Sequence, residues 1–239
     1  MKINGKDISQ YNARQWRVEF GQSDIKNESE WVRGSPLPYF DRNYRGFKEI
    51  SISILVYGDS RENIRNKISN IMSWMLETVI LDLDGYIRKF KGILIKSNVK
   101  EGSDQARKRY QLLELQFYGY EYGEEIIIST EETTEMSVYN PGNVISPAII
   151  EITPLVGMAE LTVTGIGQEC NGRNLPVKIP DLTKDKTVVL DGVEGLITED
   201  GKIKEADIWT LPAVAPGNND ITVSSNRLYV KIRILPIYM

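Results

Sequence analysis

Hydrophobic and polar residues alternate along several stretches of the chain, which is the pattern of β-strands with one buried face. The clearest case is Ile50–Val56, where β-branched residues occupy every second position. Asn4-Gly5 adds a tight hairpin within Lys2–Ile8, because this dipeptide supplies the positive φ values of a two-residue turn. Further strands are predicted at Trp16–Phe20, Val79–Leu83, Tyr86–Ile95 and Ala106–Tyr120.

One segment has the periodicity of a helix instead. Its apolar residues recur three or four positions apart, at Ile64, Ile68, Ile71, Met72 and Met75. This spacing predicts one amphipathic helix from about Ser60 to Glu77. Asp59 and Glu62 resemble a capping box at its start. Methionines at this spacing indicate core packing rather than a ligand site.

The chain changes character at Asn140–Asn143, where four turn-forming residues are adjacent. Turn signals then recur at intervals of about 8 to 12 residues, the spacing of a sandwich or barrel. The predicted strands are Ala148–Ile152, Ala159–Gly165, Leu175–Ile179, Thr187–Leu190, Gly195–Thr198, Lys202–Asp207, Ile221–Ser224 and Leu228–Leu235, with Pro180, Pro212 and Pro236 outside them. We therefore predict a mainly β protein of two domains. Residues 1–138 form an antiparallel β domain with one helix and a long arm, and residues 139–239 form a jelly-roll-like β-sandwich.

The segment Gly21–Arg45 has no periodicity and is predicted to be a long loop. Loops of this length are uncommon in compact domains and are usually functional or disordered. This one carries large apolar residues that are costly to leave in water, among them Trp31, Leu37, Tyr39 and Phe40. Two interpretations remain: a loop folded over the core of its own domain, or an arm that docks on another subunit.

Composition removes several classes of chemistry. The 239 residues include no histidine and one cysteine, so His-dependent catalytic triads and His-containing zinc sites are excluded. Asp82 and Asp84 precede Gly85 and are interpreted as an exposed hairpin shoulder, and Cys170 has no basic neighbour in sequence that would activate it. We expect no catalytic residue, no metal and no cofactor, and therefore not an enzyme. No signal peptide or membrane-spanning run is present, which predicts no membrane insertion.

Charge is unevenly distributed along the first half. Eight Lys and Arg residues lie between Arg88 and Arg109, and six Glu residues lie between Glu121 and Glu135. The two runs are interpreted either as solvated faces of separate segments or as surfaces that pair between neighbouring copies in a salt-sensitive way. The net charge of −4 argues against specific nucleic-acid binding.

The order of these features resembles the distal tail proteins of long-tailed phages, the Dit family. The residues that carry the resemblance are the start Ile3–Ile8, the irregular aromatic arm, Asn140-Pro141-Gly142, Ser146–Ile150, Val188–Asp191, Leu211-Pro212 and Pro216-Gly217-Asn218. The resemblance spans nearly the whole chain. No inserted carbohydrate-binding module of the kind found in larger members is present.

The resemblance implies a structural protein of the virion, made in the bacterial cytoplasm and placed at the distal end of a phage tail. Family members form a homo-hexameric ring, in some cases stacked, that joins the tail tube protein to tail-tip or tail-associated proteins and to receptor-binding or baseplate proteins. It also implies a galectin-like second domain. We expect the arm, with Trp31, Leu37, Tyr39 and Phe40, to form much of the subunit interface. The alternative function is a carbohydrate-binding module that attaches a partner to the bacterial cell wall, with Trp209 and Tyr229 as its candidate aromatics.

Overall fold

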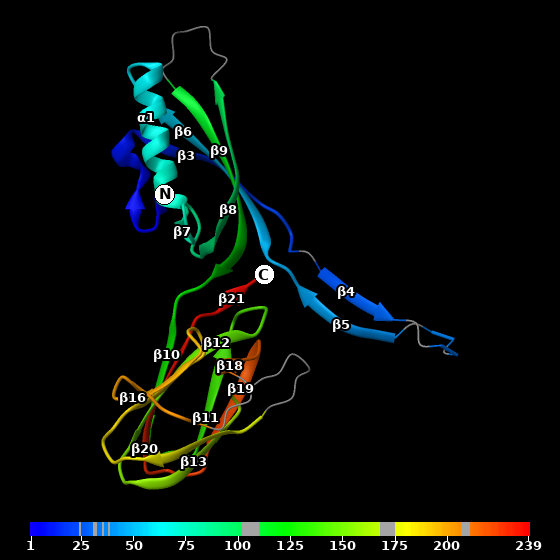
Figure 1. Ribbon diagram of the computed structural model, residues 1–239, viewed down its shortest axis with the longest axis vertical. Coiled ribbons are helices and arrows are strands. Elements are labelled where there is room, and N and C mark those ends of the chain that lie inside the picture. Colours follow the sequence, from blue (N-terminus) through cyan, green and yellow to red (C-terminus); the bar gives the residue numbers. More distant parts are fainter. Residues whose placement is uncertain are drawn as a thin grey trace. The chain divides into compact units, whose positions relative to one another are not determined.

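The chain forms two compact units, Met1–Tyr122 with Met239, and Gly123–Tyr238. The computed structural model describes residues 1–23, 25–30, 33–34, 36–37, 39–101, 110–167, 175–206 and 211–239, with the backbone alone described at 26–30 and 39–44. The described residues are mainly β, as predicted, with antiparallel sheets in both units (Figure 1).

The first unit is built on an antiparallel sheet with the strand order β2-β1-β7-β8-β9-β6-β3. Its strands are β1 (Lys2–Ile3), β2 (Lys6–Asp7), β3 (Ala13–Phe20), β6 (Lys48–Tyr57), β7 (Val79–Asp82), β8 (Lys89–Glu101) and β9 (Tyr110–Tyr122). Asn4 and Gly5 have φ values of 49° and 77° and form the predicted turn between β1 and β2. Alternation along β6 places its isoleucines on one buried face, where they join residues of β9 in the core.

Helix α1 (Arg61–Met72) covers the buried face of this sheet and continues as a short 3-10 turn, η2 (Ser73–Met75) (Figure 1). A second 3-10 turn, η1 (Ile8–Tyr11), follows β2. Ile64, Ile68 and Ile71 are buried against the strands, as their spacing predicted. The predicted cap is wrong by one position: the hydroxyl of Ser60, not Asp59, accepts the hydrogen bond from the Asn63 amide at 3.1 Å.

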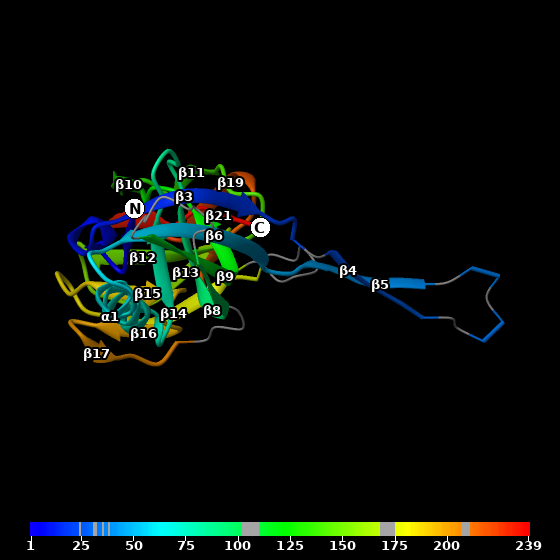
Figure 2. The ribbon, with the colours of Figure 1, turned by 90° about the horizontal axis from the view of Figure 1, so that it is seen from above.

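The arm is not the irregular loop that we predicted. Strands β4 (Ile25–Glu30) and β5 (Tyr39–Arg45) pair with each other and form a two-stranded sheet of their own (Figure 2). Their register continues that of β3 and β6. Phe20 pairs with Ile50, and five residues further along each strand Ile25 pairs with Arg45. The four strands are therefore one long β-hairpin, of which only the base belongs to the larger sheet.

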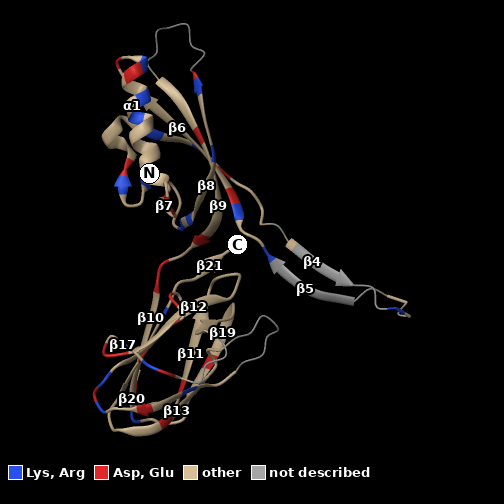
Figure 3. Ribbon diagram, in the orientation of Figure 1, with Lys and Arg blue, Asp and Glu red and all other residues tan. Residues whose placement is uncertain are grey.

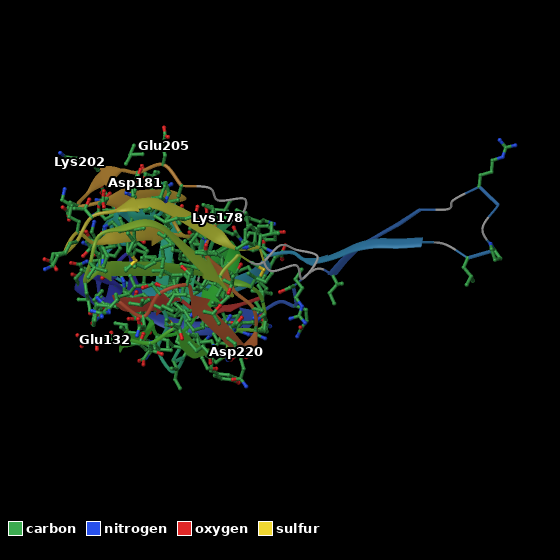
Figure 4. All side chains as sticks on the ribbon, turned by 90° about the horizontal axis from the view of Figure 1, so that it is seen from below. Glu132, Lys178, Asp181, Lys202, Glu205 and Asp220 are labelled. Atoms are coloured by element: carbon green, nitrogen blue, oxygen red, sulfur yellow. The ribbon has the colours of Figure 1, made fainter. Side chains whose placement is uncertain are left out.

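The second unit has two sheets that enclose one apolar core. One sheet has the order β10-β20-β12-β15-β16-β17, with β18 paired to β12, and the other has the order β11-β19-β13-β14. The strands are β10 (Ile126–Glu131), β11 (Glu135–Asn140), β12 (Ser146–Pro154), β13 (Met158–Thr164), β14 (Val177–Leu182), β15 (Val188–Asp191), β16 (Leu196–Glu199), β17 (Lys202–Ile203), β18 (Ala213–Val214), β19 (Gly217–Val223) and β20 (Leu228–Ile234). The short strand β21 (Ile237–Tyr238) belongs to neither of these sheets. Outward-facing residues of this unit, among them Lys178, Asp181 and Asp220, are exposed (Figure 4).

The boundary between the units differs from the prediction at 138/139, because the second unit begins at Gly123. The segment before Asn140 supplies two strands to the second unit: β10 pairs with β20, and β11 pairs with β19. The turn-rich stretch at Asn140 is therefore a loop within this unit. Pro180 also differs from prediction, because it lies inside β14. That strand is at the edge of its sheet, where the missing N–H of proline is tolerated.

Candidate subunit interface

The predicted interface residues belong to the arm. Leu37 lies in the connection between β4 and β5 and is 71% exposed. Tyr39 and Phe40 begin β5, where their backbones face Glu30 and Ser29 across the ribbon, and their side chains lie outside what is described. Trp31 lies outside the described residues. The role of these four residues stays a prediction.

Among the described side chains, large apolar residues are also exposed elsewhere in the β3–β4–β5–β6 hairpin, both within and beyond Gly21–Arg45. Ile25, at the start of β4, is 66% exposed. Phe47, just before β6, is 42% exposed, and its ring lies 5.3 Å from that of Tyr118 and 6.1 Å from that of Tyr120. These residues extend the apolar surface from the arm to its base.

Trp16 is an exposed aromatic residue, although its alternation with Val18 and Phe20 in the predicted strand would place it on the same face as them. A β-bulge between Gln15 and Arg17 sets Trp16 out of register with β6, and its side chain is 61% exposed. The guanidinium carbon of Arg14 lies 5.7 Å from the centre of the Trp16 ring and 5.5 Å from that of Tyr57, within the range of cation–π attraction. Alternation alone gives no signal for a bulge, so this residue was missed.

The sheet face opposite α1 is polar and hollowed. A depression of about 300 Å³ is lined mainly by polar side chains, with Ser51 and Ser53 as its small floor residues between longer side chains on β3, β8 and β9. Glu114 is one of the lining residues, and its Oε1 lies 2.7 Å from Lys100 Nζ. The hydrogen bond from Lys100, together with its positive charge, lowers the pKa of Glu114. This surface presents paired charges to solvent.

Asp84, one of the two carboxylates considered in the sequence analysis, makes contacts that hold the fold together. Asp84 Oδ1 lies 2.5 Å from the Met1 ammonium nitrogen, and the Gln15 amide bonds both the N–H and the C=O of Asp84 at 3.0 Å. Within the described ranges, no group of three or more Cys, Asp or Glu residues is arranged to hold a metal ion. Cys170 lies outside those ranges. In the same part of the chain, no helix has the length and apolar character needed to cross a membrane.

The charge runs are partly accounted for within the chain. Glu121 pairs with Lys48 at 2.6 Å, and Glu125 pairs with Arg233 at 3.9 Å. Each unit carries both Lys or Arg residues and Asp or Glu residues on its elements (Figure 3). Of the candidate sugar-binding aromatics, Tyr229 is partly exposed and Trp209 lies outside the described residues.

Comparison with solved structures gives whole-chain similarity to phage proteins. The crystal structure of the phage SPP1 Dit protein, described as a paradigm of the hub adsorption apparatus of phages that infect Gram-positive bacteria, superposes with a TM-score of 0.77 at 14% identity. The match covers 99% of this chain and 98% of that one. The chain has the fold of the SPP1 Dit protein.

A chain of the phage P2 baseplate, in its activated conformation with calcium, also matches. The TM-score is 0.51 at 9% identity, over 96% of this chain and 92% of that one. No family model matches the sequence, and no curated protein matches it either. The resemblance that the order of motifs suggested is thus confirmed at the level of the fold.

Proposed function

We propose that this protein is a structural component of a phage tail tip, in which six copies form a ring hub. The ring would join the tail tube protein to tail-tip proteins and to receptor-binding or baseplate proteins. The observation that carries the proposal is the match to the SPP1 Dit protein over 99% of the chain, because both units and the arm fall within it.

The surface of the first unit supports a role in assembly. A ring requires two different faces on each subunit, since head-to-tail contacts close by rotation. The arm supplies one such face: a hairpin that leaves its sheet and carries exposed apolar residues at Ile25, Leu37 and Phe47. Apolar and aromatic residues of this kind dominate the binding energy of protein interfaces. In the second unit, the galectin-like sandwich would present the surface that holds the other tail components.

The test is the mass of the purified protein in solution. Light scattering at several concentrations, with negative-stain images of the largest species, is expected to show a six-fold ring of the 27.2 kDa chain. Replacing both Trp31 and Phe40 by alanine is expected to dissociate the ring, since a buried aromatic residue at an interface contributes about 2 kcal/mol or more. Leu76→Ala is the matched control, because Leu76 is a large apolar residue that is 85% exposed but follows η2 rather than lying in the arm.

Two results would count against the proposal. A monomer at every concentration, with no ring in the images, contradicts a self-assembling hub. A ring that persists unchanged in the Trp31→Ala, Phe40→Ala variant removes the arm from the interface and leaves the hub to be held together by other surfaces.

A further inference from the structure

The polar depression on the open face of the first sheet is built by the choice of side chains on adjacent strands. Its floor is made by Ser51 and Ser53 of β6. Across the ladder to β9 these two residues pair with Gln116 and Glu114. Because serine is short and the residues on both sides are long, β6 lies at the bottom of a depression of about 300 Å³. This volume is at the lower end of small-ligand sites.

The charges that line the depression are balanced. Arg17 and Lys96 supply two positive charges. Glu19 and Glu114 supply two negative charges, so the net charge of the lining is zero. An anion or a cation is therefore attracted by one pair and repelled by the other. A neutral ligand with several hydroxyl groups meets no such conflict, because carboxylates accept hydrogen bonds while ammonium and guanidinium groups donate them.

Neighbouring side chains hold the polar groups of the depression in place. Glu114 Oε1 accepts from Lys100 Nζ at 2.7 Å, and its Oε2 accepts from Asn98 Nδ2 at 3.4 Å. Gln116 Nε2 donates to Glu49 Oε2 at 2.9 Å. Each carboxylate oxygen has a second lone pair with which it can accept from a ligand. Acceptors that are already oriented lose less conformational entropy when a ligand binds.

Aromatic side chains stand at one end of the depression. After Gln116, the next residue of β9 on this face is Tyr118, and it pairs with Glu49 of β6. The Phe47 ring lies 5.3 Å from the Tyr118 ring, edge to face, and 6.1 Å from the Tyr120 ring. Phe47 is 42% exposed, so part of this aromatic surface faces solvent. A ring with an apolar face and polar edges can pack there while its edges bond the depression.

We propose that the open face of the first sheet binds a neutral saccharide. One sugar ring lies over Ser51 and Ser53, and its hydroxyl groups bond the surrounding carboxylates and amides. The adjoining ring packs on Phe47 and Tyr118. The site belongs to the first unit, whereas the candidate sugar-binding aromatics of the sequence belong to the second. It also goes beyond the proposed hub, which requires no ligand.

An array of immobilised oligosaccharides, both neutral and charged, is the first test. The full chain with an affinity tag is applied to the array, and binding to at least one neutral oligosaccharide is expected. The same oligosaccharide in free form is then titrated by calorimetry. Because a shallow depression binds weakly, with a Kd on the order of 1 mM, the titration extends to about 10 mM.

Two variants remove different parts of the site. Ser51→Leu with Ser53→Leu fills the depression, and Phe47→Ala removes the centre of the aromatic surface. Each is expected to weaken binding by at least about fivefold while the protein stays folded in urea unfolding. Ser137→Leu is the matched control for filling, because Ser137 is an exposed serine of a strand in the second unit. Tyr229→Ala is the control for aromatic loss, and both controls are expected to bind like the parent.

Three results would overturn the proposal. The first is no binding to any neutral oligosaccharide on the array. The second is binding to acidic or basic oligosaccharides alone, which shows recognition of charge rather than of hydroxyl groups. The third is binding that stays unchanged in both site variants, or that is lost in Tyr229→Ala, because either result assigns the sugar to another surface.

The outcomes for the sugar and for the ring are independent. A ring by light scattering that binds no neutral oligosaccharide overturns the sugar site and leaves the hub. A monomer that binds a neutral oligosaccharide, with the expected loss in both site variants, supports the sugar site and contradicts the hub.

Discussion

The loop that follows β11 in the second unit is held by the side chain of Asn140. Removing this side chain gives the most direct test of the structure. Asn140 is 1% exposed. Its Nδ2 donates to the Val214 carbonyl at 3.2 Å, and its Oδ1 accepts from the Gly142 amide at 2.9 Å. The two partners are themselves buried, so water does not replace the side chain easily.

Asn140→Ala leaves one buried N–H and one buried C=O without partners. Each unsatisfied group costs about 1–3 kcal/mol, so we expect the free energy of unfolding of the second unit to fall by about 2–6 kcal/mol. Ser146 extends the same network, since its hydroxyl accepts from the Ile237 amide at 3.0 Å. The loss is therefore expected to loosen the C-terminal segment as well as the loop.

Urea unfolding combined with amide hydrogen exchange measures both effects. Asn218→Ala is the matched control, because Asn218 lies in the neighbouring strand with an exposed side chain, and substitutions of this kind stay within about 0.5 kcal/mol. The reasoning is refuted if Asn140→Ala unfolds within about 0.5 kcal/mol of the parent and the Gly142 amide exchanges at its original rate.

Two further perturbations address the first unit. Gly119 faces Gly92 across β8 and β9, and a Cβ added at Gly119 would overlap the Lys91 carbonyl and lie 2.6 Å from the Gly92 Cα. Gly119→Ala is therefore expected to lower the free energy of unfolding by about 1–3 kcal/mol. Gly157→Ala is the tolerated control, because the nearest atom to its added Cβ lies at 3.8 Å, and equal unfolding midpoints for the two variants would contradict the packing. Lys100→Gln is expected to raise the pKa of Glu114 toward its ordinary value in an NMR titration. A lowered pKa stabilises the folded state above the pKa that Glu114 has in the unfolded chain, and this stabilisation is lost as the pH falls through the pKa of the folded state. The stability difference between parent and variant should therefore shrink below about pH 4. A difference that grows in acid would be inconsistent with this pair.

The elements that the sequence predicted well are those whose periodicity reflects one buried face. Ile64, Ile68 and Ile71 recur at helical spacing because α1 packs one stripe of side chains on the sheet. Apolar and polar residues alternate along β6 because one face of this strand is buried and the opposite face is less buried. The two-residue turn at Asn4-Gly5 follows from local sterics alone. In these places local preference and tertiary packing agree.

The arm was missed for the opposite reason. Residues 26–30, KNESE, are polar at every position, so this strand has no alternation by which to recognise it. The unit boundary was missed because turn residues do not distinguish a loop inside a domain from a linker between domains. Asn140-Pro141-Gly142 closes a loop, whereas the passage at Tyr122–Gly123 has no proline or cluster of turn residues.

The two β-bulges of the long hairpin restrict how this protein can change length. The first inserts Trp16 on the β3 side, and the second inserts Asp41 on the β5 side, between the partners of Glu28 and Ser29. Each side of the hairpin carries one extra residue, so beyond the second bulge the two sides again contain equal numbers of residues. Insertions and deletions in the arm should therefore be tolerated in facing pairs, each changing its reach by about 3.4 Å, while a single unmatched residue would turn every side chain beyond it to the opposite face.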